Sequence, residues 1–575
     1  MNTKTPWDFL EDFRGKTFHG EWPTLPEMFE ITTARFPNRN CLTVFEPNRI
    51  TLSYAQALEK IKTLAAWLNA QGLKKGMKIA VSGKNSPEWA VVYFATLFAG
   101  GIIVPIDYGL HEEEIQNLIQ KSDPFLFFVD EERYQFFKNN VVLGKDFSSK
   151  VYSLNKAHAD EYVYNLYTDK TPSIEQAASE DTAAILFTSG TMGNPKGVML
   201  SHKNLVADCY IAQTHLNIFE TDVFYALLPL HHSYTMLAVF IEALSVGAEI
   251  VFGKTIAVSK MLKELDEGKV TMLLGVPLLF NKLLAGILKG VRAKGPLVYG
   301  LIRTMMGISY LVKKLFKVNI GKSLFKKVLA QAKLSTVRIA ICGGGPLSPS
   351  VFRAYNEFGI DFIQGYGLTE TSPIIALNPV EHFKIESVGK YFHPYMEMKI
   401  LDPDEKGVGE IAVRGPMVMQ GYYQMPEETA EVLSSDGWFK TGDIGRLDEE
   451  GYLYLSGRAK NLIVTEGGKN VYPEEIENMF QLYYDDIEQI TAMGYLLDKE
   501  TKSEGIEVKV YPTDALYKKL NFERDSAEGD AAVLKHIQEI VDLENKKLLP
   551  YQKISRVTIL DKPFEMTTTK KVIRR

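Results

Sequence analysis

Cysteine is scarce in this sequence, and long hydrophobic runs are missing. The cysteines Cys41, Cys209 and Cys342 have no metal-ligand spacing and do not suggest a disulfide framework, which is typical of a reducing compartment. We expect each thiol to pack as a small hydrophobe. The longest apolar region, residues 225–252, is interrupted by histidines and glutamates. It therefore lacks the roughly 18 consecutive apolar residues of a membrane-spanning helix.

Charge and composition exclude further classes. The formal net charge of -6 argues against general affinity for nucleic acids. Residues 1–14 are polar and include acidic side chains, unlike a secretory signal peptide. With 46% hydrophobic and 24% charged residues, the composition is that of an ordinary globular protein. We therefore expect a cytoplasmic protein whose only membrane contact is peripheral, on the inner face.

The length and the apolar spacing predict an α/β protein of at least two domains. A chain of 575 residues exceeds what one hydrophobic core organises. Helical spacing over residues 54–73 and 86–98 alternates with short apolar strands at 78–83 and 102–106. This alternation predicts layered α/β subdomains with largely parallel sheets. After about residue 399, short strands and turns predict a small β-rich subdomain, and a mixed α+β region follows.

A glycine-rich loop is the most informative motif. Residues 183–187 read as a buried strand that leads into this loop, whose small residues, hydroxyls and lysine suit a phosphate. The loop is not the P-loop of NTPases, because Lys196 is followed by a glycine and an apolar run. An ordinary turn is the alternative. The candidate phosphate-binding residues are Thr188, Ser189, Gly190, Thr191, Gly193 and Lys196.

This loop resembles the phosphate-binding signature of the acyl-adenylate-forming (AMP-binding) superfamily, which includes acyl-CoA synthetases, peptide-synthetase adenylation domains and luciferases. Further signature-like segments follow in the family's order at residues 365–371, 440–445, 456–477 and 566–575. The resemblance therefore covers nearly the whole chain. It implies a large N-terminal adenylate-forming domain, residues 1–458, and a small mobile C-terminal lid domain, residues 459–575.

The resemblance also implies a site for ATP and Mg²⁺. In the family pattern Tyr366 lies against the adenine, Thr369 reaches the α-phosphate, and Glu370 is both a catalytic residue and the Mg²⁺ ligand. These roles agree with the chemistry of an aromatic face and a hard oxygen ligand. Asp443 matches the acid that binds the ribose, and Arg458 the arginine that contacts ribose or phosphate. The remaining residues of this implied site are Gly343, Gly344, Gly345, Gly365 and Gly367, with a plain turn as the alternative for 343–345.

The basic C-terminus is expected to supply the adenylation lysine. Many relatives read Thr-Gly-Lys here, whereas this chain reads Thr-Lys-Lys at residues 569–571. Alignment on the final arginines places Lys571 at the position of the catalytic lysine and Lys570 in the glycine position, with Lys570 as the alternative lysine. By resemblance, Thr191 of the glycine-rich loop is a further catalytic residue. A lysine that bridges carboxylate and α-phosphate stabilises charge developing in the transition state. A solvated basic terminus is the other interpretation.

Two half-reactions are implied, with rotation of the C-terminal domain between them. By resemblance the hinge falls on Lys460, and Gly467, Gly468 and Lys469 line the tunnel for coenzyme A. Glycines suit a loop that closely approaches a narrow chain. His231 and His232 resemble a segment beside the acyl pocket, although structural histidines are the alternative.

Residues 268–356 contain no acidic side chain. Within them, residues 283–329 mix large apolar residues with many lysines and arginines, and stretches such as 310–316 predict amphipathic basic helices that favour anionic membranes. The alternatives are a packed basic helical pair with a solvated face, or a surface that docks an acidic acyl carrier protein. The basic side chains are Lys289, Arg292, Lys294, Arg303, Lys313, Lys314, Lys317, Lys322, Lys326 and Lys327.

From the resemblance we expect a long-chain fatty acid:CoA ligase that uses Mg-ATP and proceeds through an acyl-adenylate. One rival transfers the acyl group to acyl carrier protein, and another activates an aryl or short-chain acid. A nucleotide-binding regulator without catalysis is the rival from a different class, opposed by the presence of Lys196, Glu370, Asp443 and Lys571. A luciferase-like oxidase is the weakest rival, because nothing in the sequence specifies oxygen chemistry.

Overall fold

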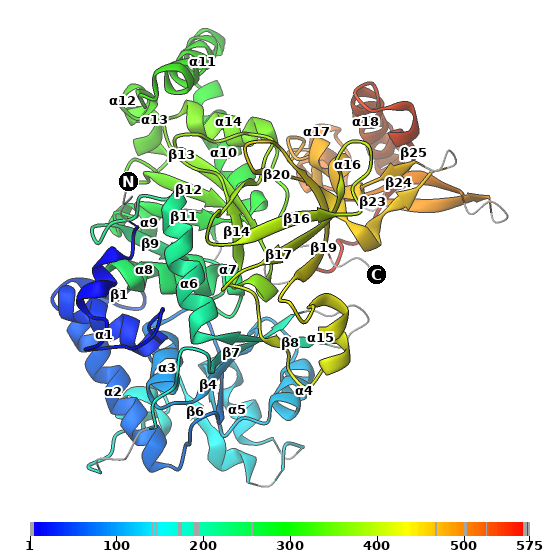
Figure 1. The fold of residues 1–575 in the computed structure, drawn as a ribbon. Helices are drawn as coiled ribbons and strands as arrows, with labels where there is room; N and C mark the ends of the chain where they lie inside the picture. The colour runs from blue at the N-terminus through cyan, green and yellow to red at the C-terminus, as the bar shows by residue number, and fades with distance from the viewer. Residues whose placement is uncertain are drawn as a thin grey trace.

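The computed structural model describes residues 5–140, 142–144, 146–170, 175–188, 195–254, 257–465, 469–498, 503–524, 526–566 and 572. Two large sheets and their helices form the greater part of the molecule, and a smaller α/β unit follows them in the chain (Figure 1). This is the mixed α/β architecture expected from the sequence, with a large N-terminal and a smaller C-terminal domain. Within the described ranges, no helix has the length and apolar content needed to cross a bilayer.

The first sheet lies at the bottom of the view in Figure 1 and is mainly parallel. Helices follow its parallel strands β3, β4 and β5, because each short buried apolar run is followed by a segment of helical spacing. Two antiparallel strands extend one edge. Among the described residues its order is β18 (Gly421–Tyr422), β8 (Lys196–Ser201), β7 (Thr182–Thr188), β4 (Ile102–Pro105), β3 (Lys78–Ser82), β5 (Leu126–Val129) and β6 (Val151–Ser153).

The second sheet is larger and changes character along its length. It is parallel from β13 to β1 and antiparallel beyond them on both sides. The strands predicted as a separate β-rich subdomain continue this sheet through β14 and β15. Among the described residues the order is β16 (Glu397–Leu401), β17 (Gly409–Arg414), β19 (Phe439–Leu447), β20 (Tyr452–Arg458), β15 (Gly389–Tyr391), β14 (Ile374–Leu377), β13 (Asp361–Gly367), β12 (Ile339–Cys342), β11 (Met272–Gly275), β9 (Val223–Ala226), β10 (Glu249–Phe252), β1 (Asn40–Val44) and β2 (Ile50–Ser53).

Helices fill the space between the sheets and cover their outer faces. All residues of α3 (Pro87–Phe98) except Glu88 are buried, as are all residues of α6 (His202–Ala212) except Lys203, and both helices belong to the core that the two sheets share. A helix that is apolar all round needs such an interior position. N-cap side chains determine where several helices begin: Ser53 caps α2 (Tyr54–Ala70) with a capping box, and Ser86 caps α3. The predicted helices and strands of this region are confirmed within a few residues.

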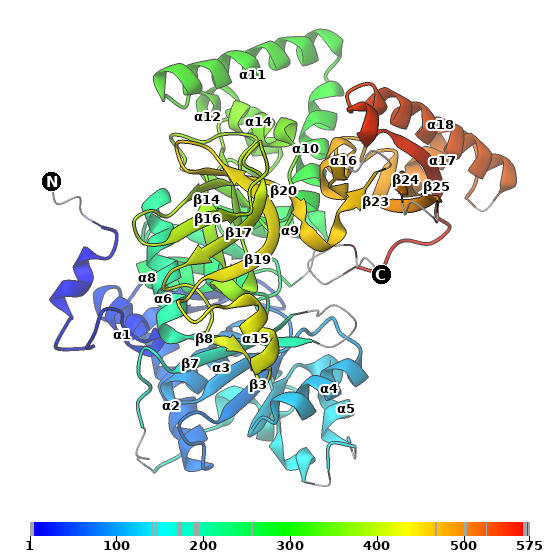
Figure 2. The ribbon, with the colours of Figure 1, turned by 45° about the vertical axis from the view of Figure 1, so that its right-hand side comes forward.

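Two long helices follow one another in the chain, α10 (Pro277–Arg292), which packs into the core, and α11 (Pro296–Phe316), which lies at the upper edge of the molecule (Figure 2). They belong to the acid-free segment, and the short helices α12 (Gly321–Leu324) and α13 (Lys326–Gln331) follow them. The helix α11 packs its inner face on α14 (Pro349–Glu357) and on α10. The amphipathic basic helices expected from the sequence are therefore present.

The C-terminal unit has a core of its own. Its three-stranded sheet of β23 (Ile487–Asp498), β24 (Ser503–Pro512) and β25 (Ile554–Ile559) is covered by α16 (Pro473–Met479), α17 (Asp514–Lys519) and α18 (Ala527–Asn545). The buried cluster around Val508, Val533 and Ile537 contains no residue before Ile463. A separate core is what a domain that moves as a unit requires.

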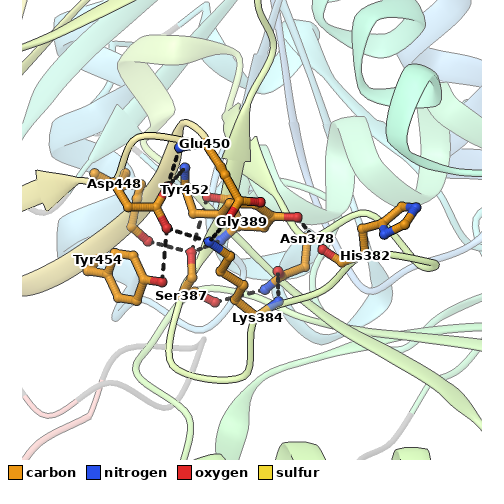
Figure 3. A network of polar contacts seen from close by, with 10 residues as sticks. Asn378, His382, Lys384, Ser387, Gly389, Asp448, Glu450, Tyr452 and Tyr454 are labelled. Atoms are coloured by element: carbon orange, nitrogen blue, oxygen red, sulfur yellow. Dashed lines mark hydrogen bonds and ion pairs between the residues drawn. The ribbon is translucent and has the colours of Figure 1, made fainter. Parts of the chain in front are cut away.

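A polar network connects two parts of the large sheet that precede the C-terminal unit in the chain (Figure 3). The ammonium of Lys384 donates to Asp448 at 2.7 Å and to Glu450 at 2.8 Å, and these hydrogen bonds raise the pKa of Lys384. The Ser387 hydroxyl donates to the Leu453 carbonyl at 2.7 Å. These bonds tie the segment between β14 and β15 to the β19–β20 hairpin. The same two strands carry Asp443 and Arg458, so the network steadies the strands on which those side chains stand.

Candidate active site

The glycine-rich motif joins two antiparallel strands of the first sheet. Thr188 ends β7 and lies opposite Lys196, which begins β8, and its hydroxyl donates to the Lys196 carbonyl at 3.4 Å. Ser189, Gly190, Thr191 and Gly193 lie outside the described residues. The two flanking residues thus place the ends of the predicted loop at one end of the β7–β8 strand pair.

Tyr422 connects the glycine-rich motif with the acid at residue 370. Its hydroxyl donates to Glu370 Oε1 at 2.9 Å, and the Lys196 ammonium lies 4.5 Å from the centre of its ring. Burial, followed by the Glu370 carboxylate, raises the pKa of the Tyr422 phenol. The pairing of β18 with β8 holds Tyr422 opposite Val198. Two signature segments far apart in the sequence therefore meet on one aromatic ring.

Sequence reasoning missed Tyr422. It stands between Gly421 and Tyr423, and no spacing distinguishes it from its neighbour. Only the placement of β18 against β8 shows which of the two tyrosines faces Glu370.

A second cluster joins Tyr366, Asp443 and Arg458. Register places Asp443 of β19 directly opposite Arg458 of β20, and Arg458 Nε lies 2.9 Å from Asp443 Oδ1. The Tyr366 hydroxyl donates to the other carboxylate oxygen at 2.6 Å. Burial, and then the Asp443 charge, raise the pKa of Tyr366. Burial lowers the pKa of Arg458, but the carboxylates of Asp443 and Glu370 outweigh this effect and raise the pKa overall.

Close packing or backbone conformation explains why several of the predicted glycines carry no side chain. A Cβ at Gly367 would collide with the Pro373 carbonyl, and one at Gly343 would come within 3.0 Å of the Tyr234 ring. Gly344 has φ +75°, which disfavours any side chain. At Gly365 a Cβ would come within 3.0 Å of Leu377. The backbone therefore approaches its surroundings closely at both loops.

The two histidines have different surroundings. His231 Nε2 lies 3.4 Å from Asp107 Oδ2, and its ring meets the edge of Tyr108. The His232 ring accepts a 3.3 Å hydrogen bond from the Tyr234 backbone N–H at the start of the one-turn helix α7 (Ser233–Thr235). Beside this helix, the Ser233 hydroxyl is in hydrogen-bond contact with Thr369 at 3.1 Å. His232 thus has a local capping bond, whereas His231 faces an acid on another element.

The chain leaves the second cluster directly into the C-terminal unit. Lys460 follows Arg458 by two residues; burial and the neighbouring Arg458 and Lys196 charges lower its pKa, while Asp443 opposes this shift. Lys469 accepts, through its carbonyl, a 3.0 Å bond from the Thr465 N–H. Gly467, Gly468, Lys570 and Lys571 lie outside the described residues. Val572 and Lys460 line the same hollow of about 430 Å³.

Gln481 bridges the C-terminal unit and the loop after Gly345. Its amide nitrogen donates to the Pro346 carbonyl and its amide oxygen accepts from the Ser348 N–H, both at 2.7 Å. Nothing in the sequence pattern singled out this glutamine. The contact fixes the unit against the loop in the orientation observed.

The donor set suits a magnesium ion held mainly by its substrate. Among the described residues, no group of three or more His, Cys, Asp or Glu side chains is placed to hold a metal. Mg²⁺ in phosphate-transfer sites takes one or two carboxylates and completes its shell with phosphates and water. Glu370, whose carboxylate faces Tyr422 beside Lys196, fits that requirement.

The sequence match assigns the chain to one enzyme family. Residues 29–423 match the AMP-binding enzyme family, and the chain belongs to it. It is 28% identical over 539 residues to a long-chain-fatty-acid–CoA ligase of Bacillus subtilis, covering 86% of this chain and 87% of the relative. It is 27% identical over 557 residues to a chloroplastic long-chain-fatty-acid–[acyl-carrier-protein] ligase of Arabidopsis thaliana, covering 82% and 75%. A feruloyl-CoA synthase of an Amycolatopsis species is 27% identical over 451 residues, covering 77% and 80%.

Solved structures share the fold. An anthranilate CoA ligase in complex with anthranoyl-AMP superposes with a TM-score of 0.75 at 18% identity, covering 96% of both chains. ATP-bound MatB from Rhodopseudomonas palustris gives 0.73 at 24% identity, covering 96% of this chain and 97% of its own. These likenesses support the predicted architecture.

Proposed function

We propose that this enzyme activates a long-chain fatty acid with ATP, forming acyl-AMP and pyrophosphate, and then transfers the acyl group to coenzyme A. The observation that carries the proposal is the convergence of two clusters from distant signatures: Lys196 with Glu370 around Tyr422, and Tyr366 with Arg458 around Asp443. One cluster offers charge for phosphates and the other offers a carboxylate for a ribose.

In this proposal the second cluster holds the nucleoside. Asp443 is held between the Tyr366 hydroxyl and the Arg458 guanidinium, so its carboxylate is already oriented before a ribose arrives. A carboxylate accepts hydrogen bonds from both hydroxyls of a cis-diol. Arg458 retains donors for a ribose or phosphate oxygen. The adenine lies between Tyr366 and the loop of Gly343, Gly344 and Gly345.

The first cluster acts on the phosphates. Lys196 and the loop of Thr188, Ser189, Gly190, Thr191 and Gly193 bind the triphosphate, and Thr369 reaches the α-phosphate. Glu370 would hold Mg²⁺, which when bound neutralises phosphate charge and favours departure of pyrophosphate. Tyr422 positions Glu370 by donating to one carboxylate oxygen, which leaves the other oxygen available. Lys571 supplies the positive charge between the attacking carboxylate and the α-phosphate, with Lys570 as the alternative.

The second half-reaction requires the C-terminal unit to move. We place the domain boundary at residues 458 and 459, immediately beyond the Asp443–Arg458 pair, and the hinge at Lys460. Gly467, Gly468 and Lys469 then line the tunnel for coenzyme A. In support, the C-terminal unit has its own buried core, and Gln481 is its side-chain link to the loop that follows Gly345.

The choice of a long-chain fatty acid rests on similarity. The Bacillus subtilis relative matches 86% of this chain, but an acyl-carrier-protein ligase and a feruloyl-CoA synthase match at nearly the same identity. We place the carboxylate end of the acid near His231, which is oriented by Asp107 and lies one residue from His232.

Pyrophosphate release tests the proposal. The full chain is assayed with ATP, Mg²⁺ and acids from acetate through palmitate to benzoate and ferulate, with and without coenzyme A. We expect turnover to be highest with long chains and to rise with coenzyme A. Adenylation that ignores coenzyme A but responds to acyl carrier protein would favour the carrier-protein ligase. Release confined to benzoate or ferulate would refute the fatty-acid assignment, and no release with any acid would refute the ligase.

A further inference from the structure

The helix α11 exposes a continuous apolar stripe. Its more-than-half-exposed aliphatic residues are Leu297 (88%), Leu301 (62%), Ile308 (52%), Leu311 (54%) and Leu315 (62%). Together with Thr304 they recur every three or four residues, which is the spacing of one helical face. Monomeric proteins rarely leave such a row uncovered.

The opposite face of α11 explains why this row points outward. Met306, Ser309 and Lys313 are its buried residues, and they face α10 and α14. The Lys313 ammonium donates to Asn356 and pairs with Asp361 at 2.6 Å, and its side chain is 10% exposed. The interpretation of Lys313 as a membrane-facing cation is wrong, because this lysine is buried and anchors α11 to the body of the enzyme. The anchor fixes which face meets solvent.

The surroundings of the stripe are positively charged. Lys314 and Arg303 are exposed on α11 itself, Lys289 is exposed on α10, which packs against α11, and Lys326 and Lys327 are exposed on α13, which packs against α12. Lys289, Lys314, Lys326 and Lys327 form no ion pair with any described residue. The whole segment 268–356 has no acidic residue to offset them. The partner of this surface must therefore be apolar in its centre and anionic around it.

We propose that the exposed face of α11 binds an anionic lipid bilayer, with the stripe lying in the interface and the cations contacting headgroups. A helix of 21 residues is about 30 Å long and lies at the outer edge of the molecule (Figure 2), so a flat surface reaches the whole stripe. Amphipathic helices with basic flanks bind such surfaces through buried apolar area and charge together. A second copy of this chain is disfavoured because pairing the stripes would bring like charges together.

Flotation of the purified full chain with vesicles tests this surface without any substrate, so the result is independent of ligase activity. Phosphatidylcholine vesicles are used with and without about 30 mol% phosphatidylglycerol. We expect binding to the anionic vesicles, and binding that weakens with salt. Absence of binding to the anionic vesicles at low salt would overturn the proposal.

Two sets of substitutions separate the apolar and charged contributions. Leu301→Ser, Ile308→Ser and Leu311→Ser together should lower the partition coefficient at least about ten-fold, because three aliphatic side chains no longer enter the interface. Lys314→Gln, Lys326→Gln and Lys327→Gln should each lower it by up to about five-fold, only on anionic vesicles. Leu543→Ser with Leu549→Ser is the matched control, since these leucines are 49% and 50% exposed on the C-terminal unit.

Two results would contradict the assignment to lipid. The first is an unchanged partition coefficient in the triple serine variant, with circular dichroism showing that it is folded. The second is a wild-type dimer in sedimentation that the serine variant converts to monomer, with vesicles binding neither form. That outcome would assign the stripe to a second copy of the chain.

Discussion

A buried carboxylate makes the stability of this enzyme depend on pH. Glu242 begins α8 (Glu242–Val246) and is 2% exposed, and its two carboxyl oxygens make no hydrogen bond of normal geometry with a described residue. Burial raises the pKa of Glu242 to about 8, although the neighbouring Cys209 and Gln213 oppose the shift. The folded chain therefore keeps a proton on Glu242 near neutral pH.

The sign and size of the effect follow from linkage. Between the ordinary carboxyl pKa of 4.5 and about 8, the unfolded chain has released a proton that the folded chain retains. Stability must fall as the pH rises through this interval, by about 1.4 kcal/mol per pH unit and about 5 kcal/mol in total. Below the ordinary carboxyl pKa of 4.5, Glu242 is protonated in both the folded and the unfolded chain, so its titration no longer lowers the stability.

Glu242→Gln removes this titration while keeping the shape of the side chain. We expect its stability relative to wild type to increase by about 3 kcal/mol between about pH 5.5 and about pH 7.5, a difference of several degrees in melting temperature. Thermal unfolding of both proteins across this range measures it. Glu113→Gln on the exposed surface of α4 (Glu112–Ser122) is the control, and it should follow wild type.

Other buried groups with shifted pKa values also make stability depend on pH, and their contributions must be separated from that of Glu242. Burial raises the pKa of Asp208 and lowers the pKa of His202 and His215 to about 4. The histidines contribute equally to both proteins, so their effect cancels when the variant is compared with wild type at each pH. The contribution of Asp208 to the pH dependence is measured separately with Asp208→Asn. A melting difference between Glu242→Gln and wild type that stays constant with pH would refute the reasoning.

Three further predictions concern the site. Tyr422→Phe should raise the Mg²⁺ concentration for half-maximal pyrophosphate release about five-fold, because Glu370 loses a hydrogen bond worth about 1 kcal/mol; an unchanged Mg²⁺ titration would contradict the link. Gln481→Ala should speed trypsin cleavage in the hinge up to about 30-fold, because two hydrogen bonds worth about 2 kcal/mol together are lost. Cleavage at the wild-type rate would show that this contact does not hold the C-terminal unit in place. Lys571→Ala should abolish acyl-AMP formation but spare thioester formation from supplied acyl-AMP; if Lys570→Ala shows this pattern instead, the roles are exchanged.

Local patterns predicted local structure well. The spacing of residues 54–73 and the capping Ser53 specify α2, and the apolar run 183–187 specifies β7, because both depend on neighbours in the chain. The signature residues Asp443 and Arg458 came from resemblance, and the structure brings them together through the β19–β20 register.

Long-range placement could not be predicted in the same way. The two-residue strand that contains Tyr422 is defined only by its pairing with β8, more than two hundred positions earlier in the chain. Lys313 has the composition of a surface cation, and only the position of Asp361 shows that it is buried. In both cases a partner distant in sequence decides the role of the residue.

The order of strands in the large sheet also has a consequence for biosynthesis. β1 pairs with β10, and Thr43 donates to Glu249 across 206 positions of chain. A ribosome that adds about 5–20 residues per second needs roughly 10–40 seconds to supply that partner. During this interval the edge of β1 has no parallel neighbour, and the nascent N-terminal region must be kept from pairing with other chains. The C-terminal unit, whose core lies within residues 463–554, can instead fold soon after it leaves the ribosome.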